Sequence, residues 1–263
     1  MTTREAIKTR RSVRTFDGRA LTPEDREKLE AFIAEIRNPY GIPVEFVLLD
    51  AKEHGLSSPV LAGETLYVAA KVERQDHAEE AFGYAFEELV LYAWSLGIGT
   101  TWIGGTMRRE LFEKAAGVEK QQLMPCVSPL GYPAAKMSVR ETLMRKSAKA
   151  GERRPGSELF FDKAFDTPLL EQDETAAAAL EMVRLAPSAV NRQPWRIVRN
   201  GRDYHFYVKH DKGFAATAAG DLQKVDLGIA LCHFMCTAGG SFALSDPGIA
   251  VPSGVEYIAT VSL

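Results

Sequence analysis

The sequence repeats itself at a fixed spacing, and this repeat constrains the fold more than any single segment does. Phe16-Asp17 and Phe165-Asp166 lie 149 residues apart, and a stretch with the apolar spacing of a helix follows each pair. At the same offset, the strand-like run that starts at Phe46 matches the one that starts at Trp195. Each copy has the order helix, turn, strand, and such a repeat predicts two similar α+β units in one chain.

Two long segments with helical spacing, residues 78–96 and 222–238, extend the repeat at an offset of 145 residues. Gly83 and Ala93 in the first have the same separation as Gly228 and Ala238 in the second. A simpler explanation stays open, because apolar residues recur every three to four positions in all amphipathic helices. The duplication predicts a pseudo-two-fold packing of two units, residues 1–145 and 160–263, joined by an exposed connecting segment, residues 146–159.

The remaining pattern places strands and helices. Runs rich in β-branched or aromatic residues predict strands at residues 44–49, 65–72, 124–130, 197–198, 204–208 and 257–263. Thr2 or Thr3 can cap a first helix, and Thr22-Pro23 opens a second one that presents Leu29 to the core. Because the longest helices are apolar on more than one face, we expect an α+β fold with mostly antiparallel sheets around buried central helices.

Charge and composition exclude several classes of function. The chain has 263 residues, of which 46% are hydrophobic and 25% charged, and its formal net charge is -3. This balance gives no global field that would attract nucleic acid or an anionic membrane, so neither is an expected partner. No apolar run approaches the roughly 18 residues that cross a bilayer, and the N-terminus lacks an apolar signal segment. We expect a cytoplasmic protein.

Metal and hydrolytic chemistry have no support in the sequence. The cysteines, Cys126, Cys232 and Cys236, are too few for a disulfide framework. Cys232, His233 and Cys236 lie in an apolar helical stretch without a second ligand cluster, so we expect buried core residues and no metal site. The five histidines are dispersed without a nucleophile motif, and no phosphate-binding loop of the Gly-x-x-x-x-Gly-Lys type is present.

A cationic run, Arg10-Arg11-Ser12-Val13-Arg14, is the first candidate for binding. Three guanidinium groups and a hydroxyl within five residues suit a phosphate and a polar heterocycle. The run also fits a solvated helix end, where cations interact favourably with the helix dipole. Taken alone, the run does not decide between these two interpretations.

A second candidate follows far along the chain, in residues 186–195, which read Ala-Pro-Ser-Ala-Val-Asn-Arg-Gln-Pro-Trp. Pro187 and Pro194 fix the backbone around Ser188, Asn191 and Gln193, so short polar side chains are presented by a rigid turn. A helix stop followed by a turn and a strand explains the prolines. It does not explain the whole string.

Together these two motifs resemble the signatures of the nitroreductase family, whose members bind flavin mononucleotide (FMN) and act as oxidoreductases. The resemblance extends to residues 97–105, Gly-Ile-Gly-Thr-Thr-Trp-Ile-Gly-Gly, and to residues 130–134, Leu-Gly-Tyr-Pro-Ala, so it spans nearly the whole chain. It implies FMN contacts from both motifs, from the glycines of the loop and from a basic residue that precedes Pro155. The implied residues are Arg10, Arg11, Ser12, Arg14, Gly104, Gly105, Pro187, Ser188, Asn191, Gln193 and either Arg153 or Arg154.

The chain departs from the common family pattern in where the motifs lie. Usual members carry both in one unit, and two identical subunits exchange them to build two flavin sites. Here the corresponding place in the first half reads Arg-Asn-Pro-Tyr-Gly-Ile, residues 37–42, and no Arg-Arg-Ser-x-Arg run precedes Phe165. The chain thus resembles the fused, duplicated members of the family, which implies one complete FMN site per chain and a degenerate site opposite.

The resemblance implies hydride transfer from NADH or NADPH to a flat, electron-poor small molecule, a nitroaromatic or a quinone, by a ping-pong mechanism. Flavin N5 would carry the chemistry, so we expect no catalytic side chain. A flavin-binding sensor or store without turnover shares every FMN motif, and a structural protein that has lost flavin is a more remote alternative. We expect a monomer, although a homodimer through other surfaces stays open.

Overall fold

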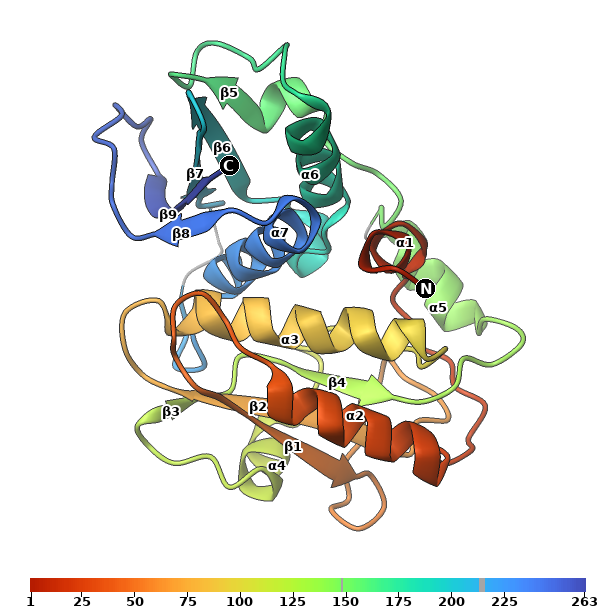
Figure 1. The fold of residues 1–263 in the computed structure, drawn as a ribbon. Coiled ribbons are helices and arrows are strands. Elements are labelled where there is room, and N and C mark those ends of the chain that lie inside the picture. The colour runs from red at the N-terminus through yellow and green to blue at the C-terminus, as the bar shows by residue number, and fades with distance from the viewer. Residues whose placement is uncertain (148, 213–215) are drawn as a thin grey trace.

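The computed structural model describes residues 1–147, 149–212 and 216–263, and it has the expected α+β composition (Figure 1). The predicted connecting segment and second unit therefore each include residues outside the described part, namely 148 and 213–215. The elements up to the connecting segment are α1 (Thr3–Thr9), α2 (Pro23–Glu35), β1 (Val44–Asp50), β2 (Leu66–Glu73), α3 (Ala78–Ser95), α4 (Arg109–Ala115), β3 (Gln122–Leu123), β4 (Val127–Leu130) and α5 (Val139–Ser147).

The elements after it are η1 (Gly156–Glu158), β5 (Phe160–Asp162), α6 (Glu174–Leu185), η2 (Ala189–Asn191), β6 (Trp195–Asn200), β7 (Asp203–Lys209), α7 (Leu222–Ala238), β8 (Ser241–Ala243) and β9 (Val255–Ser262), where η marks a 3-10 helix. The predicted boundary at residue 145 falls inside α5.

The strands form two sheets. In the first, β2 pairs antiparallel with β1, β3 and β4. The second has the order β5-β6-β7-β9-β8, in which only β5 and β6 are parallel. The prediction of mostly antiparallel sheets is confirmed.

One strand prediction is wrong in its extent. The expected strand over residues 124–130 is divided into β3 and β4. Pro125 lies in the interval, and a proline cannot donate a hydrogen bond to a neighbouring strand. The carbonyl oxygens of Met124 and Pro125 accept hydrogen bonds from Arg109, so the ladder stops at Leu123 and resumes at Val127.

Local sequence explains how the first two helices begin. The Thr2 side chain accepts a hydrogen bond from the Glu5 amide, and the Glu5 carboxylate accepts one from the Thr2 amide, which makes a capping box at α1. Thr22 caps α2, and Pro23 is its first residue. Leu29 of α2 is fully buried, as expected from its place on the apolar face.

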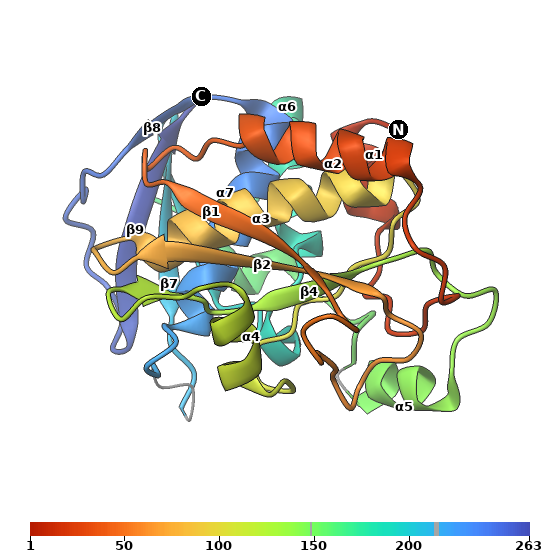
Figure 2. The same ribbon diagram turned by 90° about the horizontal axis from the view of Figure 1, so that it is seen from below.

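The two longest helices lie between the sheets and pack on each other. In Figures 1 and 2, α3 covers the first sheet and α7 lies between α3 and the second sheet. A Cβ atom at Gly83 would overlap the carbonyl oxygen of Val225, and one at Gly228 would overlap that of Glu80. Glycine at both positions therefore lets the two helix backbones approach closely.

The prediction of buried core residues holds for Cys232 and His233 but is wrong for Cys236. Cys236 is exposed because it lies in the last turn of α7, which emerges from the core. Among the described residues, no three His, Cys, Asp or Glu side chains are grouped so that they could bind a metal ion. None of the described helices combines the length and apolar character that crossing a membrane would require.

Candidate functional site

The cationic run lies beside the glycine-rich loop, residues 97–105. It leaves α1 at Arg10, and the Val13 amide donates a hydrogen bond to the carbonyl oxygen of Thr100 at 2.8 Å. Ser12 forms a parallel bridge with Thr100. A Cβ atom at Gly99 would lie 2.8 Å from the Val13 side chain, so this glycine lets the run and the loop pack together.

Arg11 is engaged within the protein. Its guanidinium donates to Glu141 of α5 at 3.0 Å, and the Thr15 hydroxyl donates to the other oxygen of that carboxylate at 2.8 Å. Glu141 is only 1% exposed, so this carboxylate has two partners in a buried place. The contacts fix α5 against the cationic run, and nothing in the sequence signalled Glu141.

Among three other arginines, Arg10 lies close enough to repel both Arg14 and Arg153. Burial lowers the pKa of Arg14, against the attraction of Glu141, and the charges of Arg145 and Arg10 lower it further. Burial also lowers the pKa of Arg153, as do the charges of Arg10 and Arg184. We call Arg10, Arg14 and Arg153 the arginine cluster.

The arginine cluster has buried hydrogen-bond donors without partners. Within the described chain, Nε and Nη2 of Arg10 and Nε of Arg153 are buried and make no hydrogen bond. Leaving a buried donor unpaired costs roughly 1–3 kcal/mol, and more when it is charged. A bound anion would supply both the missing acceptors and the missing negative charge.

The turn formed by residues 186–195 has a strained backbone. It includes η2, and the φ angles of Val190, Asn191 and Gln193 are 43°, 59° and 54°. Left-handed backbone is rare for residues other than glycine, above all for a β-branched one such as valine, and it clusters at functional sites. Ser188 stabilises this geometry by accepting a hydrogen bond from the Gln193 amide at 2.9 Å.

The connecting segment is bound to this turn through the two predicted amide side chains. Asn191 donates to the carbonyl oxygens of Lys149 and Glu152 at 2.8 and 3.0 Å, and Gln193 accepts from the Arg154 amide at 2.8 Å. Arg153 donates to the Asn191 side chain at 3.4 Å. The Arg154 side chain instead pairs with Glu158 at 3.0 Å. Arg153 is therefore the one of the two that joins the cluster.

A cavity of about 680 Å³ opens between the connecting segment and the turn. Four predicted site residues line it, namely Arg153, Arg154, Asn191 and Gln193. The segment was expected to be a plain exposed connection, yet Arg153 and Arg154 are half-buried. Arg10, Gly104 and Gly105 do not line this cavity.

The glycine-rich loop is fixed at its far end. Arg109 donates to the carbonyl oxygens of Gly104 at 2.8 Å, Pro125 at 3.0 Å and Met124 at 2.5 Å. A Cβ atom at Gly104 would lie 3.3 Å from Leu222 at the start of α7, whereas one at Gly105 would meet nothing within 4 Å. Sequence reasoning missed Arg109, because its carbonyl partners are not recognisable from residue types.

A buried carboxyl group joins α7 to the turn. Both oxygens of Asp226 lie 3.1 Å from the Ala189 amide, and the residue is 3% exposed. Burial raises the pKa of Asp226 well above its ordinary value, opposed by the Ala189 amide and assisted by the charges of Asp221 and Asp211. An acidic residue inside the apolar run of α7 was the signal that could have identified it.

These contacts bring segments from both halves of the chain together. The cationic run lies beside the glycine-rich loop, and Arg10 lies near Arg153, which holds the turn. The turn reaches α7 through Asp226. Pro187 stands half-buried directly after the last residue of α6 and its cap.

Comparison with known proteins identifies the family. Residues 2–238 match the family model described as "Putative TM nitroreductase", and no curated protein matches the chain. The solved structure of a putative nitroreductase from Thermotoga maritima has 23% identity and a TM-score of 0.66, with 100% of this chain and 94% of that chain covered. This likeness shows that the fold is nitroreductase-like.

Shorter solved structures are similar to part of the chain. An FMN-dependent nitroreductase from Clostridium difficile is 20% identical with a TM-score of 0.43, and 54% of this chain and 94% of that chain are covered. A putative NADH dehydrogenase/NAD(P)H nitroreductase from Bacteroides thetaiotaomicron is 21% identical with a TM-score of 0.44, over 52% of this chain and 89% of that chain. Because the family model covers most of the sequence, the chain belongs to the putative TM nitroreductase family.

Proposed function

We propose that this chain is an FMN-dependent oxidoreductase that passes hydride from NADH or NADPH to a flat, electron-poor acceptor, a nitroaromatic or a quinone. Membership of a nitroreductase family supports the oxidoreductase class. When bound, FMN would supply the two-electron chemistry at its N5 atom, in a ping-pong sequence. The protein would supply binding, orientation and electrostatics.

The arginine cluster carries the proposal. Arg10 and Arg153 repel each other and have buried donors that no described residue satisfies, and this matches a dianionic phosphate in charge and in hydrogen bonding. Arg10 and Arg153 would hold the phosphate, with Ser12 near the ribityl chain. Arg14 would lie by the pyrimidine edge of the ring, where a positive charge raises the reduction potential.

The other predicted residues would complete the site around the ring. The backbone of Gly104 and Gly105 would approach N5, and Pro187, Ser188, Asn191 and Gln193 would lie across the ring. Arg11 and Arg154 would act from further away, because their side chains are paired with Glu141 and Glu158. Strain in the turn is consistent with preorganisation for a ligand.

We further propose that the chain is an internal duplication with units at residues 1–145 and 160–263. The glycine contacts support it: Gly83 meets the residue three before Gly228, and Gly228 meets the residue three before Gly83. A two-fold axis generates such reciprocal contacts. One complete site per chain would follow, and a monomer would be sufficient, although a homodimer through other surfaces is compatible with it.

A spectroscopic experiment tests the function. The purified protein, reconstituted with FMN, should show flavin absorption, and anaerobic NADH or NADPH should bleach it. A quinone should then restore the colour. Persistent yellow colour after both nicotinamides would contradict turnover and favour a flavin store, and protein that neither contains nor takes up FMN would overturn the flavin assignment.

A further inference from the structure

A hydrogen-bonded chain of four residues crosses the centre of the molecule, and nothing in the proposed function uses it. The Trp102 indole N–H donates to Oε2 of Glu87 at 3.1 Å. The other oxygen of Glu87 lies 2.9 Å from Nε2 of His233, and Nδ1 of His233 lies 2.9 Å from the carbonyl oxygen of Met182. Glu87 and His233 are both completely buried.

The four residues belong to four different elements. Trp102 is in the glycine-rich loop, Glu87 in α3, His233 in α7 and Met182 in the last turn of α6. α6 leads directly into the strained turn at residues 186–195. The chain of hydrogen bonds therefore connects the two segments that would face the flavin from opposite halves of the sequence.

Hydrogen-bond chemistry fixes the direction of the outer two bonds. The Met182 carbonyl can only accept, so Nδ1 of His233 carries a hydrogen, and the indole can only donate, so Oε2 of Glu87 accepts. One proton is then shared between Nε2 and Oε1. Imidazolium with carboxylate, or imidazole with carboxylic acid, satisfies every polar atom of the chain and leaves it neutral.

Such a pair contributes little net stability, because burying the two groups costs about as much as their attraction returns. Removing one partner, however, leaves the other buried and unpaired, so alternative arrangements of the four elements are disfavoured. The Trp102 ring is also packed on α3, with its centroid 4.8 Å from that of Phe86. Both contacts restrict where the glycine-rich loop can lie.

We propose that Glu87 and His233 are positioning residues of the flavin site, which hold the glycine-rich loop in register with α6 and the turn that follows it. The inference rests on the proposed FMN binding for its affinity readout. Its structural part, the bond from Trp102 to Glu87, can be measured without flavin. The proposed FMN binding and the proposed positioning role can therefore be contradicted separately.

The test compares two substitutions at one position. Glu87→Gln can accept from Trp102 and donate to His233, so FMN affinity should stay within about threefold of the parent. Glu87→Leu leaves both neighbours unpaired, and the dissociation constant for FMN should rise at least about tenfold, because small misplacements of binding groups have effects of this size. Glu88→Gln, at the adjacent residue of α3 and outside the chain of hydrogen bonds, is the matched control and should leave affinity unchanged.

Nuclear magnetic resonance of indole groups gives the second readout. The chain has three tryptophans, and Trp102→Phe assigns the signal of interest. In the parent and in Glu87→Gln this indole proton should exchange slowly with solvent, and in Glu87→Leu it should shift and exchange faster. If Glu87→Leu fails to fold, Trp102→Phe serves as the second affinity variant, since it removes the indole N–H but keeps the buried pair, and its FMN affinity should fall at least fivefold.

The outcomes separate the two proposals. Unchanged FMN affinity in Glu87→Leu or Trp102→Phe, with a shifted or missing indole signal, would overturn the positioning role and leave the FMN site intact. An indole signal that does not respond to Glu87→Leu would also overturn it. A parent protein that does not bind FMN at all would overturn the proposed function instead, whatever the indole signal shows.

Discussion

The turn after α6 and the turn after α2 occupy equivalent places in the proposed duplication, yet their backbones differ. In the first, three residues other than glycine have positive φ angles, and the side chains of Asn191 and Gln193 hold the connecting segment. In the turn after α2, residues 36–44, the residue with a positive φ of 67° is Gly41, and glycine adopts this angle without strain. There Asn38 only holds its own turn, by donating to Ile42 at 2.6 Å.

The two turns also differ in packing and in charge. Tyr40, in the turn after α2, stacks on His77 with ring centroids 5.4 Å apart and meets Phe242 edge-on at 4.8 Å. Near the turn after α6, Arg10 and Arg153 have buried donors without a partner among the described residues. The turn after α2 has the aromatic packing instead, and it lines a cavity of about 360 Å³.

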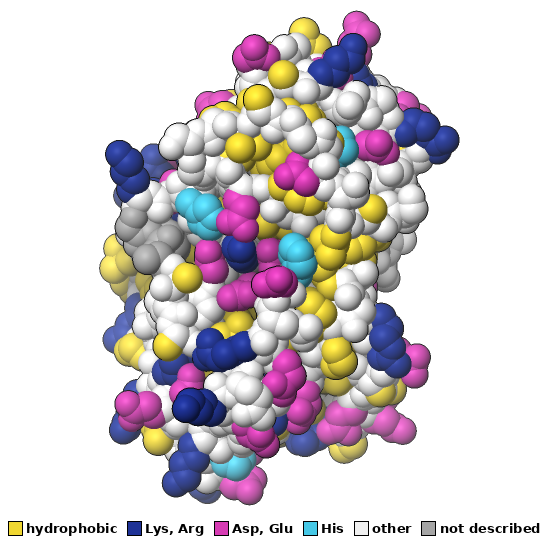
Figure 3. Space-filling model, turned by 90° about the vertical axis from the view of Figure 1, so that its left-hand side faces the viewer, with side chains coloured by type: hydrophobic (Ala, Val, Ile, Leu, Met, Phe, Trp, Pro, Cys, Tyr) yellow, Lys and Arg dark blue, Asp and Glu magenta, His cyan; other side chains and the backbone are white. Residues whose placement is uncertain are grey.

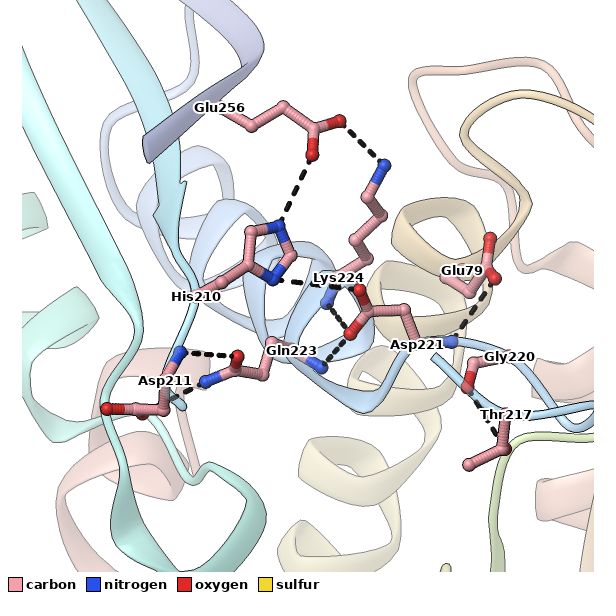
Figure 4. Close-up of polar contacts among 9 residues, drawn as sticks. All are labelled: Glu79, His210, Asp211, Thr217, Gly220, Asp221, Gln223, Lys224 and Glu256. Carbon is pink, nitrogen blue, oxygen red and sulfur yellow. Dashed lines mark hydrogen bonds and ion pairs between the residues drawn. The ribbon is translucent and has the colours of Figure 1, made fainter. Parts of the chain in front are cut away.

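Charged side chains at the start of α7 form ion pairs, although both carboxylate oxygens of the neighbouring Glu80 are buried without a hydrogen bond in the described chain. Figure 3 shows histidine and acidic side chains gathered near the middle of one face, and Figure 4 shows a network at the start of α7. Lys224 lies 2.7 Å from Glu256, and His210 lies 3.3 Å from Glu256 and 3.8 Å from Asp221. Opposite charges alternate in this network, whereas like charges face each other in the arginine cluster. The two places therefore differ in the sign of the buried groups that make no hydrogen bond with any described residue, which are guanidinium donors near the turn after α6 and the Glu80 carboxylate near the turn after α2.

Substituting the two crossing glycines tests the duplication on which this comparison depends. Gly83→Ala and Gly228→Ala should each destabilise the protein by about 2–3 kcal/mol, since the new methyl group overlaps backbone and the gain in helix propensity is only about 1 kcal/mol. Urea denaturation measures this. Gly105→Ala, which meets nothing within 4 Å, is the control. A large loss at one glycine and none at the other would contradict a reciprocal crossing.

Arg10→Ala tests the difference in charge between the turn after α6 and the turn after α2. The FMN dissociation constant should rise about thirtyfold, because a charge-assisted hydrogen bond contributes roughly 2 kcal/mol. Stability without FMN should not fall, since a repelling charge is removed. Titration of flavin fluorescence measures the affinity. Arg37→Ala at the second turn, where the guanidinium donates only to Ala34 and Ile36 carbonyls, should change neither quantity. Equal losses of FMN affinity in Arg10→Ala and Arg37→Ala would contradict the proposed difference between the two turns.

Asp226, which contacts the turn after α6, should make the stability of the protein depend on pH. Because its pKa is raised in the folded state, the folded protein binds a proton that the unfolded chain releases, so this residue's contribution to stability falls as pH rises above the ordinary aspartate value. The slope is at most about 1.4 kcal/mol per pH unit. Asp226→Asn should therefore gain stability relative to the parent between pH 5 and pH 7, as measured by urea denaturation at both values. Parallel pH profiles would contradict the raised pKa.

Tyr40→Phe should have the smallest effect. The Tyr40 hydroxyl is buried without a partner among the described residues, and the aromatic contacts do not need it. Thermal unfolding should show a gain of less than about 1 kcal/mol, with FMN affinity unchanged. A weaker affinity for FMN would mean that the turn after α2 influences the proposed FMN site.

Local signals in the sequence predicted much of this fold. Thr2, Thr22 and Pro23 act on neighbours within one helical turn, so the starts of α1 and α2 could be predicted. The repeated spacing of Gly83 and Gly228 to later alanines supported the predicted duplication, but it did not predict that α3 and α7 cross at these glycines. Short strands such as β5 and β8 were missed, since their pairing depends on partners that are remote in sequence.

The candidate site was predicted as a set of residues but not as a set of contacts. Arg11 belongs to a motif, yet its partner Glu141 lies 130 residues away and follows no pattern. Asn191 reaches backbone carbonyls of the connecting segment, which residue types do not reveal. Cys236 follows the apolar spacing of α7, but spacing does not show where a helix leaves the core.

The connecting segment has one more consequence. It covers the turn with its own carbonyl groups and contributes Arg153 to the cluster, so the polypeptide that ties the halves together is also a wall of the pocket. Two separately expressed halves would lack this tether even if they reassembled. A single proteolytic nick near Lys149 should therefore weaken binding of FMN at the proposed site while the sheets and helices stay associated.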